Sequence, residues 1–314
     1  AANLLSNISF FDLDNYQRIN TTGWHMHFLS CGKEGRPFGA ADVLTTFDTP
    51  VKFGNNYNVI FATPTLADGS VTPTTGTVRM VYYVPLAYSR NDLRGAVFMG
   101  VVNATASLQL TLNPTPSIPS GDAVSAIYTG ANTNVTITSA TINVYQCYLD
   151  QLPRYQQGQG AAAGTPILPP LDVATQYRLV NTTLTGVAPN QDFPVPFSNF
   201  QDFLSLVLAY NRVGTLANGS DINYFALAAA NTLQLFKYTP KVQALLQRSK
   251  VQTDFPLGTY MFDFRESPIS TNQVGNMQMI INPNMAETGT TVMAGFESFA
   301  LVNTVIGASS LPAG

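Results

Sequence analysis

The sequence predicts an all-β protein made of two jelly-roll domains, one in each half of its 314 residues. Short runs rich in aromatic and β-branched residues alternate with clusters of Gly, Pro, Asn, Asp and Ser, which is typical of strands joined by turns. A strand–helix–strand order occurs once in each half, and an internal repeat of this kind indicates a duplicated domain. The second half supplies eight candidate strands, the number that an antiparallel jelly roll contains.

The first half is predicted to hold fewer strands. The candidates are Ile8–Asp12, Trp24–Leu29, Val78–Val84, Ser107–Leu112 and Ile137–Leu149. In the run at 24–29, alternation would place Trp24, Met26 and Phe28 on a buried face, with His25 and His27 on the other. A short helix over Leu86–Val97, capped by Ser89, is predicted between the strands at 78–84 and 107–112.

The second half repeats the strand–helix–strand order, and its strands and helix cap are more clearly marked in the sequence. Its candidate strands are Tyr177–Thr182, Asp192–Phe197, Phe203–Tyr210, Ile222–Ala226, Leu233–Tyr238, Gly258–Phe264, Asn276–Ile281 and Val292–Val302. A helix over Lys241–Val251 is predicted between the strands at 233–238 and 258–264, with Thr239 as N-cap and Pro240 at the first helical position. Val242, Leu245, Leu246 and Ser249 share one stripe of this helix.

The domain boundaries follow from composition. Residues 154–170 are rich in Gln, Gly, Ala and Pro, so we expect a linker between a first jelly roll at 1–153 and a second at 171–314. The first half begins at the equivalent of the third strand of the second. Its first two strands would therefore come from another segment, unless the sequence is incomplete.

Charge and hydropathy exclude several classes of partner. Lys and Arg total 15 against 18 Asp and Glu, without a basic cluster, so direct nucleic-acid binding is not expected. No apolar run reaches the length of a membrane span. Only 11% of the residues are charged, against about a quarter in an average protein, which predicts that assembly covers much of the surface.

Residues capable of site chemistry are few, and no catalytic, cofactor-binding or metal-binding residue is predicted. His25 and His27 lack a third ligand at a recognised spacing, and Asp12–Asn15 is better explained as a turn. Cys31 and Cys147 are interpreted as buried thiols. Trp24, the one tryptophan, is expected in the core.

A group of acidic residues near the end of the chain could suggest hydrolysis. It consists of Asp254, Asp263 and Glu266, and the better interpretation is a solvated edge on which Arg265 pairs with a neighbour. A two-domain β-sandwich hydrolase or glycan-binding module nevertheless stays open as an alternative, because fold alone does not fix function.

Several short motifs, taken together and in order, resemble the coat proteins of the tectivirus family, tailless icosahedral bacteriophages with an internal membrane. The matching stretches are 22–28, 81–89 continuing to 97, 145–153, 253–256, and 275–276 through 282–283. They span essentially the whole chain.

The resemblance implies a structural, non-enzymatic protein with two jelly rolls side by side. It also implies a homotrimer of nearly hexagonal outline that tiles the outer shell of the virion, after assembly in the host cytoplasm. Expected partners are further copies of the chain, penton proteins, and minor coat or cementing proteins. Membrane contact would come from an inward N-terminal arm, which has no counterpart before Ala1.

Overall fold

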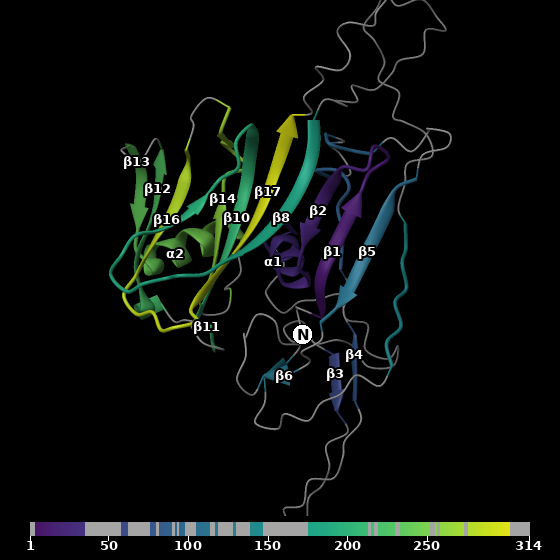
Figure 1. The fold of residues 1–314 in the computed structure, drawn as a ribbon, viewed down its shortest axis with the longest axis horizontal. Coiled ribbons are helices and arrows are strands. Elements are labelled where there is room, and N and C mark those ends of the chain that lie inside the picture. Colours follow the sequence, from purple (N-terminus) through teal and green to yellow (C-terminus); the bar gives the residue numbers. More distant parts are fainter. Residues whose placement is uncertain are drawn as a thin grey trace, which may run out of the picture.

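The computed structural model contains two facing β-sheets in the second half of the chain (Figure 1). One sheet contains β14, β10, β17 and β8 as neighbours, and the other contains β13, β12, β16 and β9. The structure describes residues 4–34, 58–61, 76–79, 82–89, 92, 94–97, 105–113, 117–118, 128–129, 139–146, 175–212, 215–216, 219–229, 233–251, 255, 258–272 and 276–301.

These strands form the predicted second jelly roll. In chain order they are β8 (Thr175–Leu184), β9 (Phe193–Pro196), β10 (Gln201–Arg212), β12 (Ile222–Ala229), β13 (Leu233–Tyr238), β14 (Thr259–Asp263), β16 (Gln278–Pro283) and β17 (Thr291–Leu301). The chain passes repeatedly between the two sheets, and all pairings within them are antiparallel. All eight strands predicted for this half are confirmed. Three short elements, β11 (Thr215–Leu216), a 3₁₀ turn η1 (Gly219–Asp221) and β15 (Ile269–Ser270), complete it.

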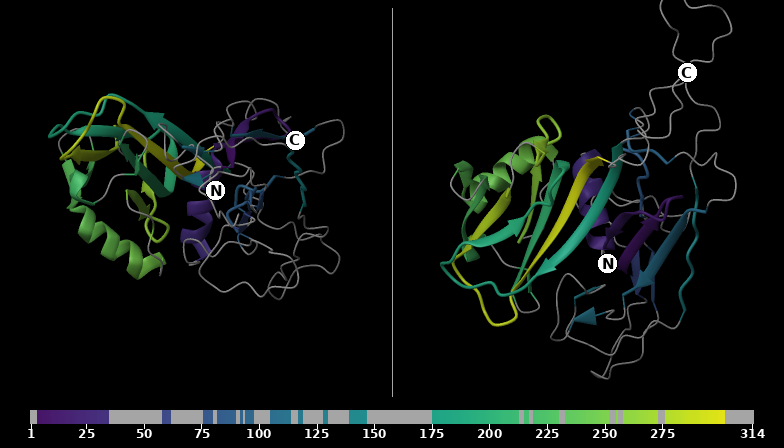
Figure 2. Two further views of the ribbon diagram at one scale, coloured as in Figure 1. Left: turned by 90° about the horizontal axis from the view of Figure 1, so that it is seen from below. Right: turned by 45° about the horizontal axis from the view of Figure 1, so that its top comes forward.

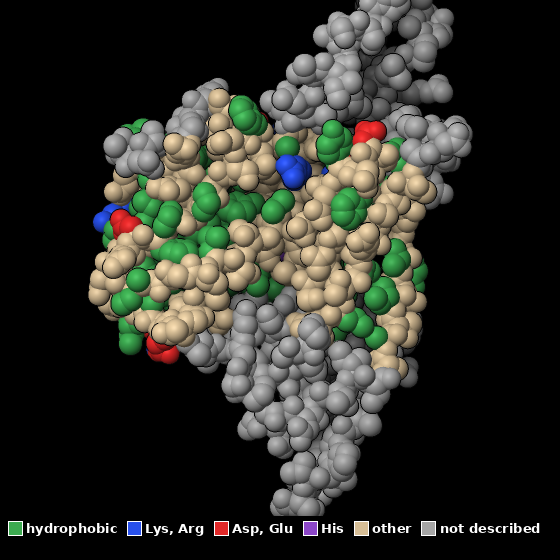
Figure 3. Space-filling view, viewed as in Figure 1, with side chains coloured by type: hydrophobic (Ala, Val, Ile, Leu, Met, Phe, Trp, Pro, Cys, Tyr) green, Lys and Arg blue, Asp and Glu red, His purple; other side chains and the backbone are tan. Residues whose placement is uncertain are grey.

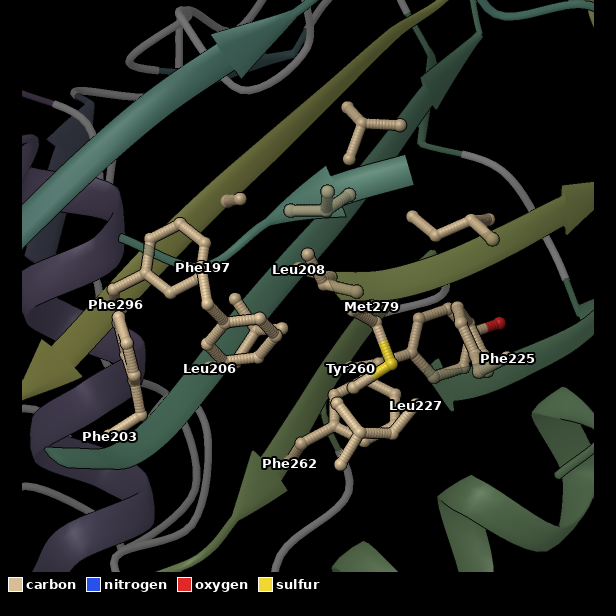
Figure 4. Packing of buried hydrophobic residues seen from close by; sticks show 14 of the residues in the cluster. Phe197, Phe203, Leu206, Leu208, Phe225, Leu227, Tyr260, Phe262, Met279 and Phe296 are labelled. Atoms are coloured by element: carbon tan, nitrogen blue, oxygen red, sulfur yellow. The ribbon is translucent and has the colours of Figure 1, made fainter. Parts of the chain in front are cut away.

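The core of this barrel lies between the two sheets (Figure 4). Phe197, Phe203 and Phe296 meet edge to face, with ring centroids 4.7 to 5.5 Å apart. Phe225 packs in the same way against Phe262 at 5.3 Å. Offset and edge-to-face geometry suits the quadrupoles of aromatic rings, so these contacts stabilise the barrel beyond the area they bury.

Strand β10 is buried on both faces. Leu206 and Leu208 point into the barrel core, whereas Val207 and Ala209 belong to a second apolar cluster on the opposite face of the sheet. A strand between two cores reads as a continuous apolar run rather than an alternating one. The sheet therefore needs a cover on its outer face.

The first half of the chain supplies this cover and extends the sheet. Its described elements are β1 (Leu5–Phe11), β2 (Gln17–Thr21), α1 (Gly23–Glu34), β3 (Asn58–Phe61), β4 (Gly76–Arg79), β5 (Ser107–Leu112), β6 (Ser117–Ile118) and β7 (Tyr128–Thr129). β2 pairs in parallel with β8 through Ile19 and Leu179, so one sheet continues from β10 to β5. Figure 1 shows α1 behind this continuous sheet, against one of its faces. The strands predicted at 8–12 and 107–112 are confirmed as β1 and β5.

The strand predicted at Trp24–Leu29 is wrong, because these residues form α1. Thr22 caps the helix: its Oγ1 accepts a hydrogen bond from the backbone N–H of His25 at 3.2 Å. Residues 23–29 are all buried, the two histidines included, so the helix has no polar stripe at 3.6-residue spacing. The alternation of apolar residues and histidines at 24–28 therefore does not reflect one buried and one exposed face, because both kinds of residue are buried in the helix.

The helix predicted at Leu86–Val97 is also wrong in its described part, which contains bends and a turn. Ser89 closes a turn instead, since its Oγ accepts a hydrogen bond from the N–H of Asp92 at 3.0 Å. Gly95 has a φ of +74°, and a Cβ there would lie 2.4 Å from the backbone nitrogen of Tyr177. A helix cannot include such a residue without a break.

Two further strand predictions fail in part. The run Val78–Val84 is a strand only at its start, where β4 ends at Arg79, and residues 82–84 are irregular. In the run Ile137–Leu149, residues 139–146 are exposed and belong to no described strand. The apolar side chains there are exposed as well, and Val144 has 64% of its surface accessible. The other residues of that run, and the linker at 154–170, lie outside the described residues.

The helix predicted at Lys241–Val251 is confirmed as α2 (Pro240–Val251). Pro240 begins it, and the Oγ1 of Thr239 accepts a hydrogen bond from the N–H of Val242 at 3.4 Å. The strand–helix–strand order β13–α2–β14 is therefore present in the second half. The described residues of the first half show no matching helix between β4 and β5.

Candidate functional site: the seam between the two halves

The seam is the region where α1 packs against the outer face of β8, β10 and β17. Trp24 and Phe28 lie in the same apolar cluster as Val207 and Ala209, and the ring centroids of Trp24 and Phe28 are 4.9 Å apart. The expectation that Trp24 lies in the core is confirmed, because it is 4% exposed. Both halves of the chain thus contribute to one hydrophobic core.

Close approach of α1 to the sheet depends on a glycine of β17. A Cβ at Gly295 would lie 2.2 Å from Cδ2 of His25, so no larger residue fits without moving the helix. The side chain of His25 is fully buried, and its Nδ1 lies 2.6 Å from Oγ1 of Thr21. Burial lowers the pKa of His25 to about 4, although the charge of Glu297 partly opposes this. The imidazole is therefore neutral at pH 7.

Glu297 is the centre of a buried polar cluster in the seam. Its carboxylate accepts hydrogen bonds from Lys33 Nζ at 3.0 Å, Tyr177 Oη at 2.6 Å and Ser205 Oγ at 2.9 Å. Glu297, Tyr177 and Ser205 are fully buried residues of the second half, whereas Lys33 lies in the last turn of α1. This ion pair joins the two halves across the seam.

Aromatic rings surround the ammonium group of Lys33. Its Nζ lies 4.3 Å from the ring centroid of Tyr88 and 5.0 Å from that of Tyr177. Burial raises the pKa of Tyr177 well above its usual value, and the carboxylate of Glu297 raises it further. The phenol therefore stays protonated and donates to Glu297. Cation–π contacts and a buried carboxylate together hold a charge that would be costly to bury alone.

Arg265 fixes the C-terminal end of α1. Its guanidinium donates to both oxygens of Asp263, at 2.8 and 2.7 Å, and to the backbone carbonyl of Gly32 at 3.3 Å. The predicted pairing of Arg265 with a neighbour is confirmed. Glu266 is exposed and lies 3.6 Å from Lys250, while Asp254 lies outside the described residues. Of the two described acidic residues, Asp263 lies in a largely buried ion pair and not on the expected solvated edge, whereas Glu266 pairs at the surface.

The other residues considered in the sequence analysis pack or form hydrogen bonds that stabilise the fold. Cys31 is buried as predicted, with Sγ 3.8 Å from Nε2 of His27, whereas Cys147 lies outside the described residues. Asp12 forms the predicted turn, since its Oδ1 accepts the N–H of Asp14 and of Tyr16. Within the part of the chain that the structure describes, no group of three His, Cys, Asp or Glu could hold a metal ion. Among these residues, no helix is long and apolar enough to cross a bilayer.

Sequence reasoning missed the seam, because Glu297, Tyr177 and Lys33 are separated by more than a hundred residues along the chain. One signal was available: Glu297 stands inside the predicted strand Val292–Val302, between Phe296 and Phe299. A carboxylate in an apolar strand needs a cation or several donors when it is buried. The cation itself could not be identified, since Lys33 lies beyond the strand predicted at Trp24–Leu29 and is brought to Glu297 only by the helix α1.

Comparisons with known proteins agree with the fold. The family described as "P3 major capsid protein N-terminal" matches residues 1–152, and "P3 major capsid protein C-terminal" matches residues 174–313. Major capsid protein P3 of Enterobacteria phage PRD1 is 36% identical over 314 residues, which cover 99% of this chain and 76% of that protein. A solved structure of Sulfolobus Turreted Icosahedral Virus is 10% identical, with a TM-score of 0.52 over 97% of this chain and 76% of that one.

The chain is thus a viral coat protein of the double jelly-roll class. More particularly, it belongs to the P3 major capsid protein family, in which the tectivirus phage PRD1 is represented. The resemblance seen in the sequence is confirmed. The family is structural and non-enzymatic, which decides against the hydrolase alternative. A major capsid protein assembles with copies of itself, and this places the chain in the virion shell.

Proposed function

We propose that the chain forms a homotrimer, and that such trimers are the pseudo-hexameric units of an icosahedral shell around an internal membrane. Two barrels in each subunit would give six barrels around a threefold axis, so one chain could occupy near-hexagonal lattice positions. In this proposal the barrels correspond to residues 1–153 and 171–314, joined by the linker at 154–170.

The continuous sheet across the seam is the observation that carries the proposal. The parallel pairing of β2 with β8 and the Lys33–Glu297 ion pair fix the two halves of one subunit against each other. A pseudo-hexagonal unit requires such a fixed arrangement, because two barrels on a loose tether would not keep a sixfold outline. The low content of charge also fits a surface that neighbours cover, and Figure 3 shows few charged side chains on the face in view.

Further partners belong to the same proposal. Penton proteins and minor coat or cementing proteins would meet the trimers at the vertices and between the capsomers. Contact with the internal membrane is a further part of the proposal. Folding and trimerisation would take place in the host cytoplasm.

The native mass in solution tests the proposal. Light scattering behind a sizing column should give about three times the chain mass of 33.8 kDa, unchanged on dilution. Negative-stain images of the same peak should show a near-hexagonal outline. A monomer that persists at high concentration would overturn the proposal.

A further inference from the structure

Helix α2 packs against β14 with polar residues and not with its apolar ones. Gln243 and Gln247 are buried, at 4% and 5% exposure, and both hydrogen-bond the backbone of Met261 in β14. Nε2 of Gln243 donates to the carbonyl of Met261 at 2.7 Å, and Oε1 of Gln247 accepts its N–H at 2.8 Å. The two glutamines act on this edge as a neighbouring strand would, so α2 covers the free edge of β14.

The apolar side of α2 consequently faces outward. Val242, Leu245 and Leu246, which we call the α2 stripe, are 41%, 61% and 39% exposed. At 3.6 residues a turn, the centre of the stripe lies roughly 130° around the helix from the buried glutamines. This is the reverse of the usual amphipathic arrangement, in which the apolar stripe faces the core.

Exposed apolar side chains gather along this part of the chain. Thirteen large hydrophobic side chains are exposed among the described residues, and five of them fall between residues 233 and 246. Besides the α2 stripe these are Leu233 and Leu235 of β13, the strand that leads into α2. Figure 2 shows α2 at the outer edge of the second half. Of these residues, the three of the α2 stripe are neighbours on one helix face, and a contiguous apolar patch marks an interaction surface more often than scattered single residues do.

The charge of α2 indicates what covers the stripe. The helix contains Lys241, Arg248 and Lys250 and no acidic residue. Since the whole chain has a net charge of −3, the remainder carries −3 − 3 = −6. Another copy of the chain is therefore net acidic outside this helix, opposite in sign to α2.

Charge also decides how two copies meet. Two α2 helices placed face to face would bring Lys241 and Arg248 of both copies together, which like-charge repulsion opposes, while Lys250 is paired with Glu266 of its own chain. The helix must then contact a different surface of its neighbour. Contacts of this heterologous type close into rings when the rotation allows. An anionic membrane is the other surface of suitable charge, and binding to anionic vesicles is therefore one arm of the test below.

We propose that the α2 stripe is buried against a neighbouring copy of this chain within the trimer. The proposal rests on the trimeric state proposed above and names one of its contact surfaces. Apolar side chains supply the centre of this contact and the basic residues of α2 its rim, as in protein interfaces generally.

Photo-crosslinking of the full-length protein tests the contact. Leu245→p-benzoylphenylalanine, irradiated in the light-scattering peak, should give a product of twice 33.8 kDa that contains peptides of this chain only. The same probe at position 244 is the matched control, because Ala244 is exposed but lies about 150° from the centre of the stripe. No crosslinked dimer from position 245, in protein whose native mass is that of a trimer, would overturn this contact and leave the trimer itself standing.

Charge substitution gives an independent result. Leu245→Glu should raise the concentration at which the subunits dissociate at least tenfold, while Ala244→Glu should leave it unchanged. Both positions are exposed, so circular dichroism should show wild-type melting of the separated monomers. Wild-type dissociation of the Leu245→Glu protein would overturn the proposal. Binding of wild-type protein to phosphatidylglycerol vesicles that Leu245→Glu abolishes, with native mass unaffected, would overturn it in favour of a membrane surface.

Discussion

Among single residues, Glu297 and Lys33 form the most consequential pair in the described structure. A carboxylate with no exposed surface is stabilised by an ammonium group and two hydroxyl donors. Such a pair contributes little net stability compared with apolar residues of equal volume. The loss of one partner is nevertheless strongly destabilising, because the other charge stays buried without compensation. The pair fixes the position of α1 on the sheet, since it forms only when Lys33 of α1 reaches Glu297 of β17.

Removal of the cation should therefore destabilise the protein strongly. Lys33→Met is expected to lower the free energy of unfolding by about 3–5 kcal/mol, because Glu297 stays buried without its counter-charge. Lys33→Met combined with Glu297→Gln should recover part of this loss. Urea unfolding followed by Trp24 fluorescence measures both variants. Glu266→Gln, which affects an exposed pair, is the control, and equal effects at the two sites would contradict the assignment.

His25 predicts a dependence of stability on pH. Its pKa is about 4 in the folded protein and 6.5 in the reference state, so the unfolded chain binds a proton first as pH falls. The contribution of this group is complete above pH 6.5 and is lost between about pH 6.5 and 4. It amounts to roughly 3 kcal/mol over that interval.

Melting temperatures measured from pH 7.5 to 4 test this expectation. His25→Leu should flatten the slope over the interval, whatever its effect on stability at pH 7.5. His27→Leu provides a comparison in the same helix. An unchanged slope in the His25 variant would assign the acid sensitivity to another group.

At the scale of elements, α2 stabilises the barrel by covering an edge and not by burying its apolar face. The backbone of Met261 receives side-chain hydrogen bonds in place of a neighbouring strand. An uncovered edge strand can pair with another chain and promote aggregation. The helix thus protects β14 while its other side stays available.

Loss of this cover should be measurable. Gln243→Ala leaves the buried carbonyl of Met261 without its donor, so the free energy of unfolding should fall by about 1–3 kcal/mol. Gln234→Ala, on the exposed face of β13, should have little effect. Chemical denaturation of the two variants gives the comparison. Increased aggregation of Gln243→Ala on mild heating would further support edge protection, whereas equal stabilities would contradict it.

In the whole molecule, the two halves share a core and a sheet. Leu204, Val207 and Ala209 of β10 pack in the same cluster as Phe10, Ile19 and Phe28 of the first half. A barrel with its outer sheet face uncovered would expose this apolar surface to water.

Separate expression of the second half tests this dependence. A fragment of residues 171–314 should bind a hydrophobic dye and aggregate, and co-expression with residues 1–153 should restore solubility. The covering role of α1 can be isolated with Phe28→Asp in the 1–153 fragment, which should abolish the rescue. A soluble, cooperatively melting 171–314 fragment would show that the second half is independent.

The sequence alone determined the fold class, the eight strands of the second barrel, α2 with its Pro240 start, and membership of a coat-protein family. The strands and α2 depend on local patterns of turns, alternation and capping, which act over a few residues. The coat-protein family came from a different source, the resemblance of several short motifs to the tectivirus proteins. The same patterns misled at 24–29 and 86–97. There the helix was buried on every side, and the expected helix was excluded by contact of Gly95 with the backbone of Tyr177.

Only the tertiary structure decided which face of each element is covered. The α2 stripe was visible in the sequence, but its outward direction depends on two glutamines reaching the edge of β14. Likewise, Glu297, Tyr177, Ser205 and Lys33 become a site only when α1 packs on β17. Contacts between residues far apart along the chain leave no periodic trace in the sequence, and for that physical reason the seam required the folded molecule.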